Sequence, residues 1–440
     1  MDVQIETPGG LVRQLRVRIP ADRITSAVDS RLKQIATRAR VPGFRPGKAP
    51  FRVIEQQYGP AARLEVIQDL VRGSYPEAVD KAGVHPASAP QFEVVAEKSG
   101  EPLEYLARFE VYPEIKLKDL SGLKVERPTV QIADADIDKV IQSMRRAQRT
   151  FAAAGRPARE GDVCRLDFEG AVDGAAFPGG KGENVQLEIG QSRFLPDLEN
   201  GIKGHAKGER FTVDVQFPAD YRNEQLKGRK AQFSVELKDV QEPRLPELDE
   251  AFFKAQGLEA GQGLDALRAR VRTALEAERD KAIKGRVKAQ VLEQLLAANP
   301  IPLPQAMVAQ ETLRLREEAA SRFNAARMKP EQVQKLFPDE MLAPNAQRRV
   351  SLGLLIAEVI KQRKIVVDAA RQERLLDEVA ADYQQPEQIK QYYRGNPQLM
   401  QGLRAMVMEE QVVESLLAGA KSKDVPMTLD ELLKPAAPAP

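Results

Sequence analysis

The residues best suited to binding a partner are gathered in one short stretch, residues 43–50. It reads Gly-Phe-Arg-Pro-Gly-Lys-Ala-Pro and combines two glycines, two prolines, two cations and one aromatic ring. This mixture is unsuited to a helix or a central strand, because proline lacks a backbone donor and glycine costs backbone entropy. The prolines also restrict the residues before them, so we predict an ordered loop with Phe44, Arg45 and Lys48 on its tip. A polyanion with some apolar surface fits such a tip, and an ordinary basic turn between two helices is the simpler alternative.

The sequence around this loop is basic, although the chain as a whole is almost neutral. Its 440 residues carry 66 Lys and Arg against 64 Asp and Glu, a formal net charge of +2. Between Leu11 and Arg52, however, eleven Lys or Arg stand against two acids, Asp22 and Asp29. Such a block attracts phosphate groups through counterion release. A basic nucleic-acid-binding protein is therefore one interpretation of this segment, while the rest of the chain does not share its charge.

The pattern Gly-Phe-Arg-x-Gly-Lys-x-Pro resembles the ribosome-docking signature of the bacterial trigger factor family. The resemblance implies seven ribosome-binding residues: Gly43, Phe44, Arg45, Pro46, Gly47, Lys48 and Pro50. It extends over essentially all 440 residues. It implies an ATP-independent chaperone that docks on the large ribosomal subunit at the peptide exit and shields nascent and unfolded polypeptides. It also implies roles in protein export and cell division, and it leaves room for a homodimer off the ribosome.

A second candidate site lies among aromatic residues between positions 160 and 243. The runs at 163–170 and 232–237, the Asp-Gly pair at 173–174 and Phe-Leu-Pro at 194–196 resemble the strands and short helix of an FKBP-type prolyl isomerase. The resemblance implies an active site lined by Phe168, Phe177, Phe194, Leu195, Leu198, Tyr221 and Phe233. Aromatic residues at strand spacing usually pack inside a domain, so a plain hydrophobic core is the competing interpretation.

Prolyl isomerisation needs no acid, base or nucleophile. The barrier to rotation, on the order of 20 kcal/mol, comes from amide resonance. A dry aromatic site favours the twisted amide, whose carbonyl is less polar than that of the planar form. The sequence departs from the family pattern after Pro196, where Asp197-Leu198 replaces the usual glycine and aromatic residue. We therefore expect isomerase activity that is weakened at the floor of the site.

Other catalytic chemistry finds little support in the sequence. Phosphate-loop, dinucleotide, HExxH and GxSxG patterns are absent. The two histidines, His85 and His205, lie far apart, and we interpret both as solvated or structural. The single cysteine, Cys164, allows no intramolecular disulfide and is read as a small packed residue. We expect neither a metal nor a cofactor.

The C-terminal region offers a third candidate surface. Seven of the nine methionines lie beyond residue 300. Methionine is flexible and polarisable, so an exposed methionine-rich face can adapt to many apolar partners. Filling of the hydrophobic core is the more ordinary role of a methionine. The client-binding candidates are Met307, Met328, Met400 and Met406.

Periodicity divides the chain into regions of different fold. We predict a multidomain α+β protein: an N-terminal α+β ribosome-docking domain, an FKBP-like antiparallel β half-barrel with a short helix, and an all-α elongated C-terminal domain. The boundaries are 1–112 for the docking domain, 113–159 for a connector, 160–243 for the isomerase domain, 244–434 for the helical chaperone domain and 435–440 for a disordered tail.

The sequence shows no secretory signal and no apolar run of about 18 residues, so we expect a cytoplasmic protein without a membrane span. The leading hypothesis is a ribosome-associated chaperone with isomerase activity. The alternative is a prolyl isomerase that acts mainly on folded or released clients without docking on the ribosome.

Overall fold

The computed structural model describes residues 1–42, 44, 47–98, 100–118, 122–191, 194–219, 221, 223–224, 226–323, 327–381 and 383–434. The chain divides into two compact units. The first contains Met1–Arg127 and Gly285–Asp424. The second contains Pro128–Lys284 and the described residues from Val425 onward. Each unit is described by itself.

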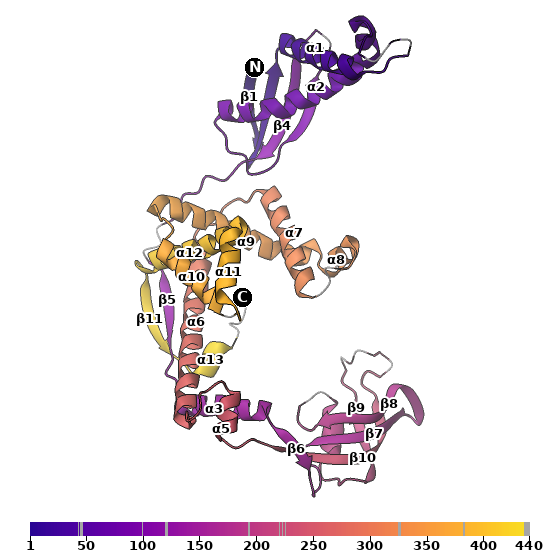
Figure 1. Cartoon of the computed structure of the whole chain (residues 1–440), viewed down its shortest axis with the longest axis vertical. Coiled ribbons are helices and arrows are strands. Elements are labelled where there is room, and N and C mark those ends of the chain that lie inside the picture. Colours follow the sequence, from indigo (N-terminus) through magenta and orange to yellow (C-terminus); the bar gives the residue numbers. More distant parts are fainter. Residues whose placement is uncertain are drawn as a thin grey trace. The chain divides into compact units, whose positions relative to one another are not determined.

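The N-terminal part of the first unit is an antiparallel sheet covered by two helices (Figure 1). The strands lie in the order β1-β2-β4-β3. Their bounds are β1 Asp2–Gly9, β2 Val12–Ile19, β3 Gln91–Ala96 and β4 Leu103–Glu110, and the helices are α1 Ala21–Arg38 and α2 Phe51–Ala82. Alternate residues of β2 and β4, including Leu15, Val17 and Tyr105, are fully buried against Ile24 of α1 and Ile67 of α2. The alternation of apolar and basic residues in β2 thus places one face on the core and leaves Arg18 exposed.

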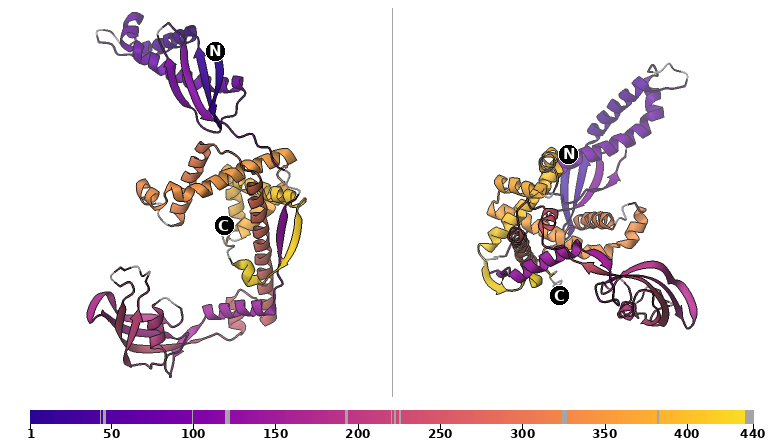
Figure 2. Two further views of the ribbon diagram at one scale, coloured as in Figure 1. Left: turned by 180° about the vertical axis from the view of Figure 1, so that it is seen from behind. Right: turned by 60° about the horizontal axis from the view of Figure 1, so that its bottom comes forward.

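Helices dominate the remainder of the first unit. They are the second half of α6 Leu264–Ala298, then α7 Gln305–Arg322, α8 Pro330–Leu336, α9 Asp339–Arg363, α10 Ala369–Ala381, α11 Pro386–Gly395 and α12 Pro397–Leu417. Val291 and Leu295 of α6 share a core with Leu355 of α9 and Val412 of α12. The structure adds one strand to this region, β11 Lys421–Pro426, which pairs with β5 Lys124–Thr129. Figure 2 shows these two strands side by side.

The second unit contains a five-stranded sheet in which every pairing is antiparallel. Its strands are β6 Thr150–Ala153, β7 Val163–Val172, β8 Ala175–Glu188, β9 Arg210–Gln216 and β10 Lys230–Arg244. The order is β6-β10-β7-β8, with β9 also paired to β10. A short helix, α4 Pro196–Ile202, packs on β9 through Gly201, which lies against Val213. This is the antiparallel sheet with a short helix that the sequence predicts.

A second core in this unit joins segments that are distant in the sequence. It is built by α3 Asp134–Ala147, α5 Glu250–Ala255, the first half of α6 and α13 Leu429–Leu433. Ile137 and Ile141 of α3 are buried there with Phe252, Leu267 and Leu432. The segment 113–159, expected to be a connector, therefore supplies a strand to each of two sheets and a helix to this core.

No helix in the described residues is long and apolar enough to cross a membrane. The described residues also contain no group of three or more His, Cys, Asp or Glu side chains arranged to hold a metal ion.

Candidate functional site

The basic loop connects α1 to α2, and a small hydrophobic core holds the two helices together at its base. Leu32 of α1, Val41 of the loop and Ile54 of α2 are buried in this core. Helix α1 ends with a hydrogen bond from the Ala39 amide to the Ile35 carbonyl (2.8 Å). Helix α2 begins when the amide of Val53 bonds to the carbonyl of Pro50 (2.9 Å). Both ends of the loop are therefore fixed, because they continue directly into packed helices.

Gly47 lets the loop fold back onto the end of α1. Its φ is +76°, in the left-handed region that favours glycine. A Cβ atom at this position would lie 3.0 Å from the carbonyl oxygen of Thr37. The glycine that the docking signature contains is thus required by both conformation and space.

Phe44 and Lys48 are exposed, as the sequence predicts. The Phe44 side chain leaves 42% of its residue surface open to solvent, and its amide donates to the Val41 carbonyl (3.1 Å). Pro50 is also exposed, immediately before α2. Gly43, Arg45 and Pro46 lie outside the described residues. An aromatic side chain and a lysine of the same loop are therefore both presented to solvent.

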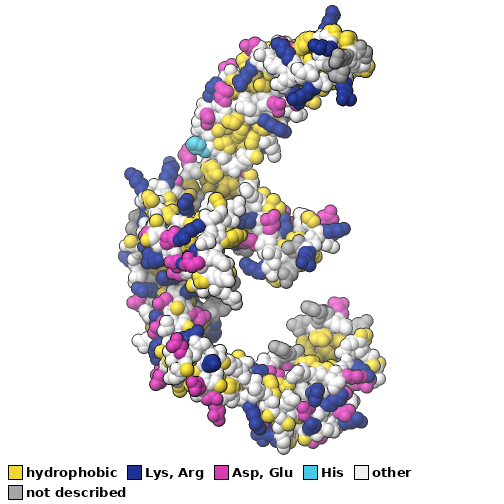
Figure 3. Space-filling view, viewed as in Figure 1, with side chains coloured by type: hydrophobic (Ala, Val, Ile, Leu, Met, Phe, Trp, Pro, Cys, Tyr) yellow, Lys and Arg dark blue, Asp and Glu magenta, His cyan; other side chains and the backbone are white. Residues whose placement is uncertain are grey.

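A basic groove of about 690 Å³ lies beside the loop, between the C-terminal half of α1 and Tyr58 of α2. Arg31, Lys33 and Arg38 line it. Arg31 bonds to Glu65 of α2, with its Nε 3.0 Å from Oε2. Among the described residues Lys33 and Arg38 have no ion pair, so their charges face solvent. Figure 3 shows Lys and Arg side chains projecting from this helical end of the domain.

Five aromatic rings meet on one face of the sheet in the second unit. The Phe168 and Phe233 centroids are 5.8 Å apart, and those of Phe177 and Phe233 are 6.1 Å apart, both edge-on. Phe217 extends the group, with its centroid 6.0 Å from Phe177 and 4.8 Å from Tyr221. Phe217 was not among the predicted site residues, although it stands in the same alternating run as Phe211 and Val215. We call Phe168, Phe177, Phe217, Tyr221 and Phe233 the aromatic cluster.

The cluster combines buried and accessible rings. Phe233 and Phe217 are buried, at 5% and 2% exposure, whereas Phe168, Phe177 and Tyr221 are half-buried and pack against the same core. Burial thus divides the cluster into rings that belong to the core and rings that are partly accessible. The buried rings are core, and the half-buried rings present a face to solvent on which a ligand can lie.

The remaining predicted residues of this site surround the start of α4. Leu195 precedes the helix, and its carbonyl accepts from the Leu198 amide (2.9 Å). Leu198 is only 3% exposed and belongs to the same core as the aromatic cluster. Phe194 packs on that core too, but it also lines a cavity of about 250 Å³ with Arg149 and Phe151. Phe194 therefore lies partly apart from the rings.

Two carboxyl groups of this domain form ion pairs with lysine side chains. The Lys238 ammonium, 2.6 Å from Asp167, holds the pKa of that carboxyl below its usual value. A hydrogen bond from Lys207 to Asp239 (3.0 Å) likewise lowers the pKa of Asp239. Because both carboxyls stay ionised at neutral pH, neither is suited to donate a proton.

The contacts of the single histidine and the single cysteine of this domain are those of packed residues and do not favour catalysis. His205 stacks on Phe211 with centroids 3.6 Å apart, and its Nδ1 lies 2.7 Å from Glu209. Cys164 is fully buried, and burial raises the pKa of its thiol to about 12. A thiol in this state is a poor nucleophile.

The helical part of the first unit contains an open groove of about 950 Å³ between α7 and α9. Met307, Leu313 and Leu354 give it apolar lining, and 57% of Leu313 is exposed. Of the other methionine candidates, Met328 and Met406 are exposed, at 41% and 53%, and Met400 is half-buried. The structure thus brings one of the four methionines to this groove.

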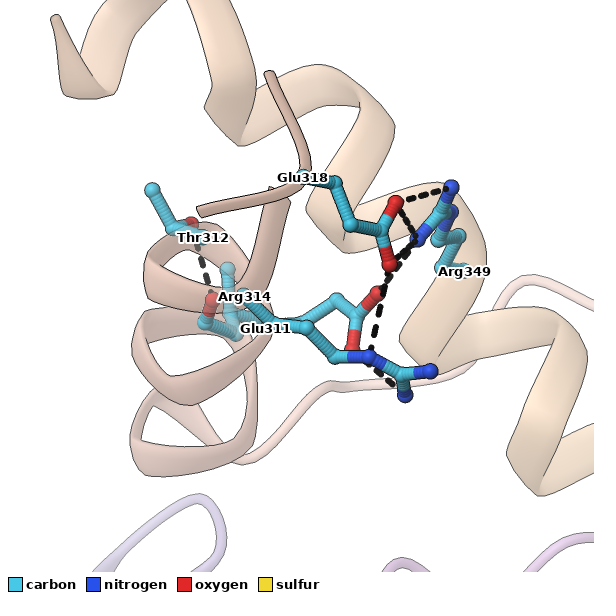
Figure 4. A network of polar contacts seen from close by, with 6 residues as sticks. Glu311, Thr312, Arg314, Glu318 and Arg349 are labelled. Carbon is cyan, nitrogen blue, oxygen red and sulfur yellow. Dashed lines mark hydrogen bonds and ion pairs between the residues drawn. The ribbon is translucent and has the colours of Figure 1, made fainter. Parts of the chain in front are cut away.

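Charged residues form one rim of the groove (Figure 4). Arg349 of α9 donates to Glu311 (3.0 Å) and Glu318 (3.1 Å), which are both on α7. Arg314 lies 3.4 Å from Glu318. The hydrogen bond from Arg349 lowers the pKa of Glu318. This network ties α7 to α9 beside the apolar lining.

Comparison with known proteins bears on all three regions. The family model described as bacterial trigger factor protein matches residues 1–144, and that of the trigger factor C-terminus matches residues 263–418. The model of FKBP-type peptidyl-prolyl cis-trans isomerase matches residues 154–238. The last match contains the strands that carry the aromatic cluster.

Relatives match over almost their full length. The trigger factor of Thioalkalivibrio sulfidiphilus is 44% identical over 435 residues, covering 99% of this chain and 98% of the relative. The trigger factor of Pseudoalteromonas atlantica is 40% identical over 433 residues, covering 98% of this chain and 99% of the relative. A solved structure described as "Promiscuous Substrate Recognition in Folding and Assembly Activities of the Trigger Factor Chaperone" has the same fold, with a TM-score of 0.50, 19% identity and coverage of 95% and 99%. The chain therefore belongs to the bacterial trigger factor family of ribosome-associated chaperones, which carry an FKBP-type prolyl isomerase domain.

Proposed function

We propose that this chain docks through the α1–α2 loop on the large ribosomal subunit at the peptide exit. The observation that carries the proposal is Phe44, a large apolar side chain held in solvent at 42% exposure by a loop that is anchored at both ends. Lys48 adds attraction to ribosomal phosphates, as do Lys33 and Arg38 of the basic groove, which form no ion pair within the described part of the chain. Docking here leaves the groove between α7 and α9 open for a client.

We further propose that the aromatic cluster catalyses prolyl isomerisation. The half-buried rings of Phe168, Phe177 and Tyr221 offer an apolar surface on which a proline ring can pack, and its binding would displace water from their accessible faces. In this environment the twisted amide, with its less polar carbonyl, is stabilised relative to the planar amide. Phe194, Leu195 and Leu198 would border the bound residue at the start of α4. An aliphatic side chain at 198 makes the contact weaker than an aromatic one would.

The helical region is proposed to bind unfolded clients through its exposed apolar side chains. Leu313 and Met307 in the groove, with Met328 and Met406 elsewhere, are adaptable contacts for varied apolar sequences. We propose that the protein acts in the cytoplasm, without ATP. A homodimer off the ribosome stays a prediction.

Sedimentation with translating ribosomes tests the docking proposal. Wild type should pellet with ribosomes, and a chain with alanine at Phe44, Arg45 and Pro46 should remain in the supernatant with unchanged thermal unfolding. Binding of the free protein to naked RNA with the same affinity as to ribosomes would favour a general nucleic-acid-binding protein. Equal pelleting of both chains would refute docking through this loop.

The division of labour between domains has its own test. Residues 160–243 contain β7, β8, β9 and nearly all of β10, together with most of the core of this sheet, whereas the helical region has the open groove between α7 and α9. A chain in which this segment is replaced by a short Gly-Ser linker should therefore still suppress client aggregation and should lose isomerase activity. If the folded deletion no longer protects clients, the isomerase domain is the main chaperone site. The alternative of an isomerase without ribosome docking is not favoured, because the match to the family includes the docking domain.

A further inference from the structure

Two rings of the aromatic cluster lie opposite glycines of neighbouring strands. Phe233 of β10 is the register partner of Gly170 of β7, and Phe168 of β7 is the partner of Gly182 of β8. Directly paired residues of an antiparallel sheet project their side chains from the same face. Each ring therefore has bare backbone, rather than a side chain, as its neighbour across the strand pair.

The rings occupy the space that a side chain would need. A Cβ atom on Gly170 would lie 2.6 Å from Cε1 of Phe233, and one on Gly182 would lie 2.6 Å from Cε1 of Phe168. Carbon atoms in favourable contact are about 3.5–4.0 Å apart. Gly180 lies close to a third ring within the same strand: its Cβ would lie 3.0 Å from Cε2 of Phe177 and 3.0 Å from the carbonyl oxygen of Gly170. Three glycines thus lie beneath three rings.

The rings cannot simply move aside within the domain. Phe233 is 5% exposed and lies edge-on between Phe168 and Phe177, at 5.8 and 6.1 Å. A methyl group on Gly170 would therefore push Phe233 against the other two rings. A methyl group on Gly182 would press on the half-buried ring of Phe168 and on Val185, whose Cγ2 would lie 2.8 Å from it. Overpacking of this kind forces side chains out of their preferred rotamers.

We propose that Gly170 and Gly182 are positioning residues for prolyl isomerisation. They let the rings of Phe233 and Phe168 lie against the sheet, and so they set the height and tilt of the surface that receives the proline of the client. Neither glycine contacts the substrate; each acts through its ring. The proposal rests on the isomerase function proposed above and assigns part of its specificity to the sheet backbone.

Alanine substitutions test the proposal. The cis–trans exchange rate of a short Xaa-Pro peptide, measured by NMR over a range of peptide concentrations, separates kcat from KM. Gly170→Ala and Gly182→Ala should each lower kcat/KM by roughly tenfold, because small displacements of orienting groups are costly. Gly155→Ala is the matched control: this glycine is exposed in the same domain, and nothing lies within 4 Å of the position of its Cβ. Its kcat/KM should stay at the wild-type value.

Paired variants distinguish positioning from general destabilisation. If Gly170 acts through Phe233, then Gly170→Ala should have little further effect on kcat/KM in a chain that carries Phe233→Leu. It should keep most of its effect beside the control change Gly155→Ala. An equal fold-loss in both backgrounds, or unchanged kcat/KM in both glycine variants, would overturn the proposal while leaving the isomerase function intact.

Failure of the isomerase function itself is recognised separately. It would appear as a wild-type chain that leaves the peptide at its uncatalysed rate. Affinity for the same peptide, from NMR titration, then decides the role of the glycines. Weaker binding by Gly170→Ala and Gly182→Ala, but not by Gly155→Ala, would support positioning of a binding surface, and equal binding by all four chains would refute it.

Discussion

Replacing Phe44 with alanine tests how much of the docking energy is apolar. Full burial of a phenylalanine side chain stabilises a complex by about 1.5–3 kcal/mol. Because Phe44 leaves 42% of its surface exposed in the free chain, docking can gain about 0.6–1.3 kcal/mol by burying this exposed part. At about 1.4 kcal/mol per factor of ten, Phe44→Ala should weaken ribosome binding roughly three- to eight-fold.

The salt dependence separates this contribution from charge. Titration of a fluorescently labelled chain with ribosomes at several salt concentrations gives both the Kd and its slope against salt. Phe44→Ala should raise the Kd and leave the slope unchanged, since the lost contact involves no counterion. Lys48→Ala should instead reduce the slope by about one.

Phe323→Ala is the matched control, because Phe323 is 69% exposed but lies at the end of α7. Its Kd for ribosomes should equal that of wild type. The reasoning is refuted if Phe44→Ala changes the slope instead of the Kd at fixed salt, or if Phe323→Ala weakens binding as much as Phe44→Ala does.

Three further predictions concern the other regions. Burial raises the pKa of Cys164 to about 12, so at pH 8 only about one thiol in 10⁴ is ionised. Iodoacetamide should therefore label Cys164 in urea but not in the native chain. Rapid labelling of the native chain would contradict the burial of this thiol. Leu198→Phe should raise isomerase turnover on a short proline peptide modestly, because an aromatic contact adds about 0.5–1.5 kcal/mol. It should also lower the melting temperature, because residue 198 is only 3% exposed and a larger side chain must be fitted there. A lower turnover would argue against Leu198 as the floor of the site. The Arg349 hydrogen bond holds the pKa of Glu318 below the usual 4.5, so the stability from this pair is present above pH 4.5 and declines as the pH falls through the lowered pKa. Glu318→Gln should therefore flatten the loss of melting temperature on acidification, and identical acid profiles for both chains would rule out this contribution.

Local patterns in the sequence were sufficient to predict many elements of the fold. The alternation in Leu15–Ile19 and the apolar spacing in 265–297 correspond to β2 and α6. Asp22 is a residue type that caps helices and Pro42 one that ends them, but α1 runs from Ala21 to Arg38, so Asp22 lies in its first turn and the helix ends before Pro42. Gly59-Pro60 is a pair that usually interrupts a helix, yet it lies inside the continuous helix α2. Packing of Ala62 and Val66 against the domain stabilises that helix despite its proline.

The elements that were missed depend on partners far along the chain. Strand β1 is exposed along almost its whole length, and its apolar alternation is limited to Val3 and Ile5, yet β2 pairs with it. Strands β5 and β11 pair across nearly 300 residues. Neither has an apolar run, and each is a strand only because the other is present.

The candidate sites differ in predictability for a related reason. The docking loop was recognisable because its composition is local: proline, glycine and exposed cations lie within eight residues. The aromatic cluster takes its members from β7, β8, β10 and the segment after β9, and family resemblance was needed to group them. Phe217 was missed because its alternation with Val213 and Val215 marks it equally well as core.

The segment from Val425 onward completes the core of the second unit, although residues 285–424 of the first unit lie before it in the sequence. Thr428 caps α13 by accepting from the amide of Glu431, and Leu429 and Leu432 then enter the core that Ile137 and Ile141 of α3 form. Asp430, on the exposed side of α13, accepts a hydrogen bond from Lys139 of α3 (2.9 Å). The core of α3 and α5 is therefore incomplete until α13 has been made, and the order of the elements along the sequence differs from the order in which their cores can form.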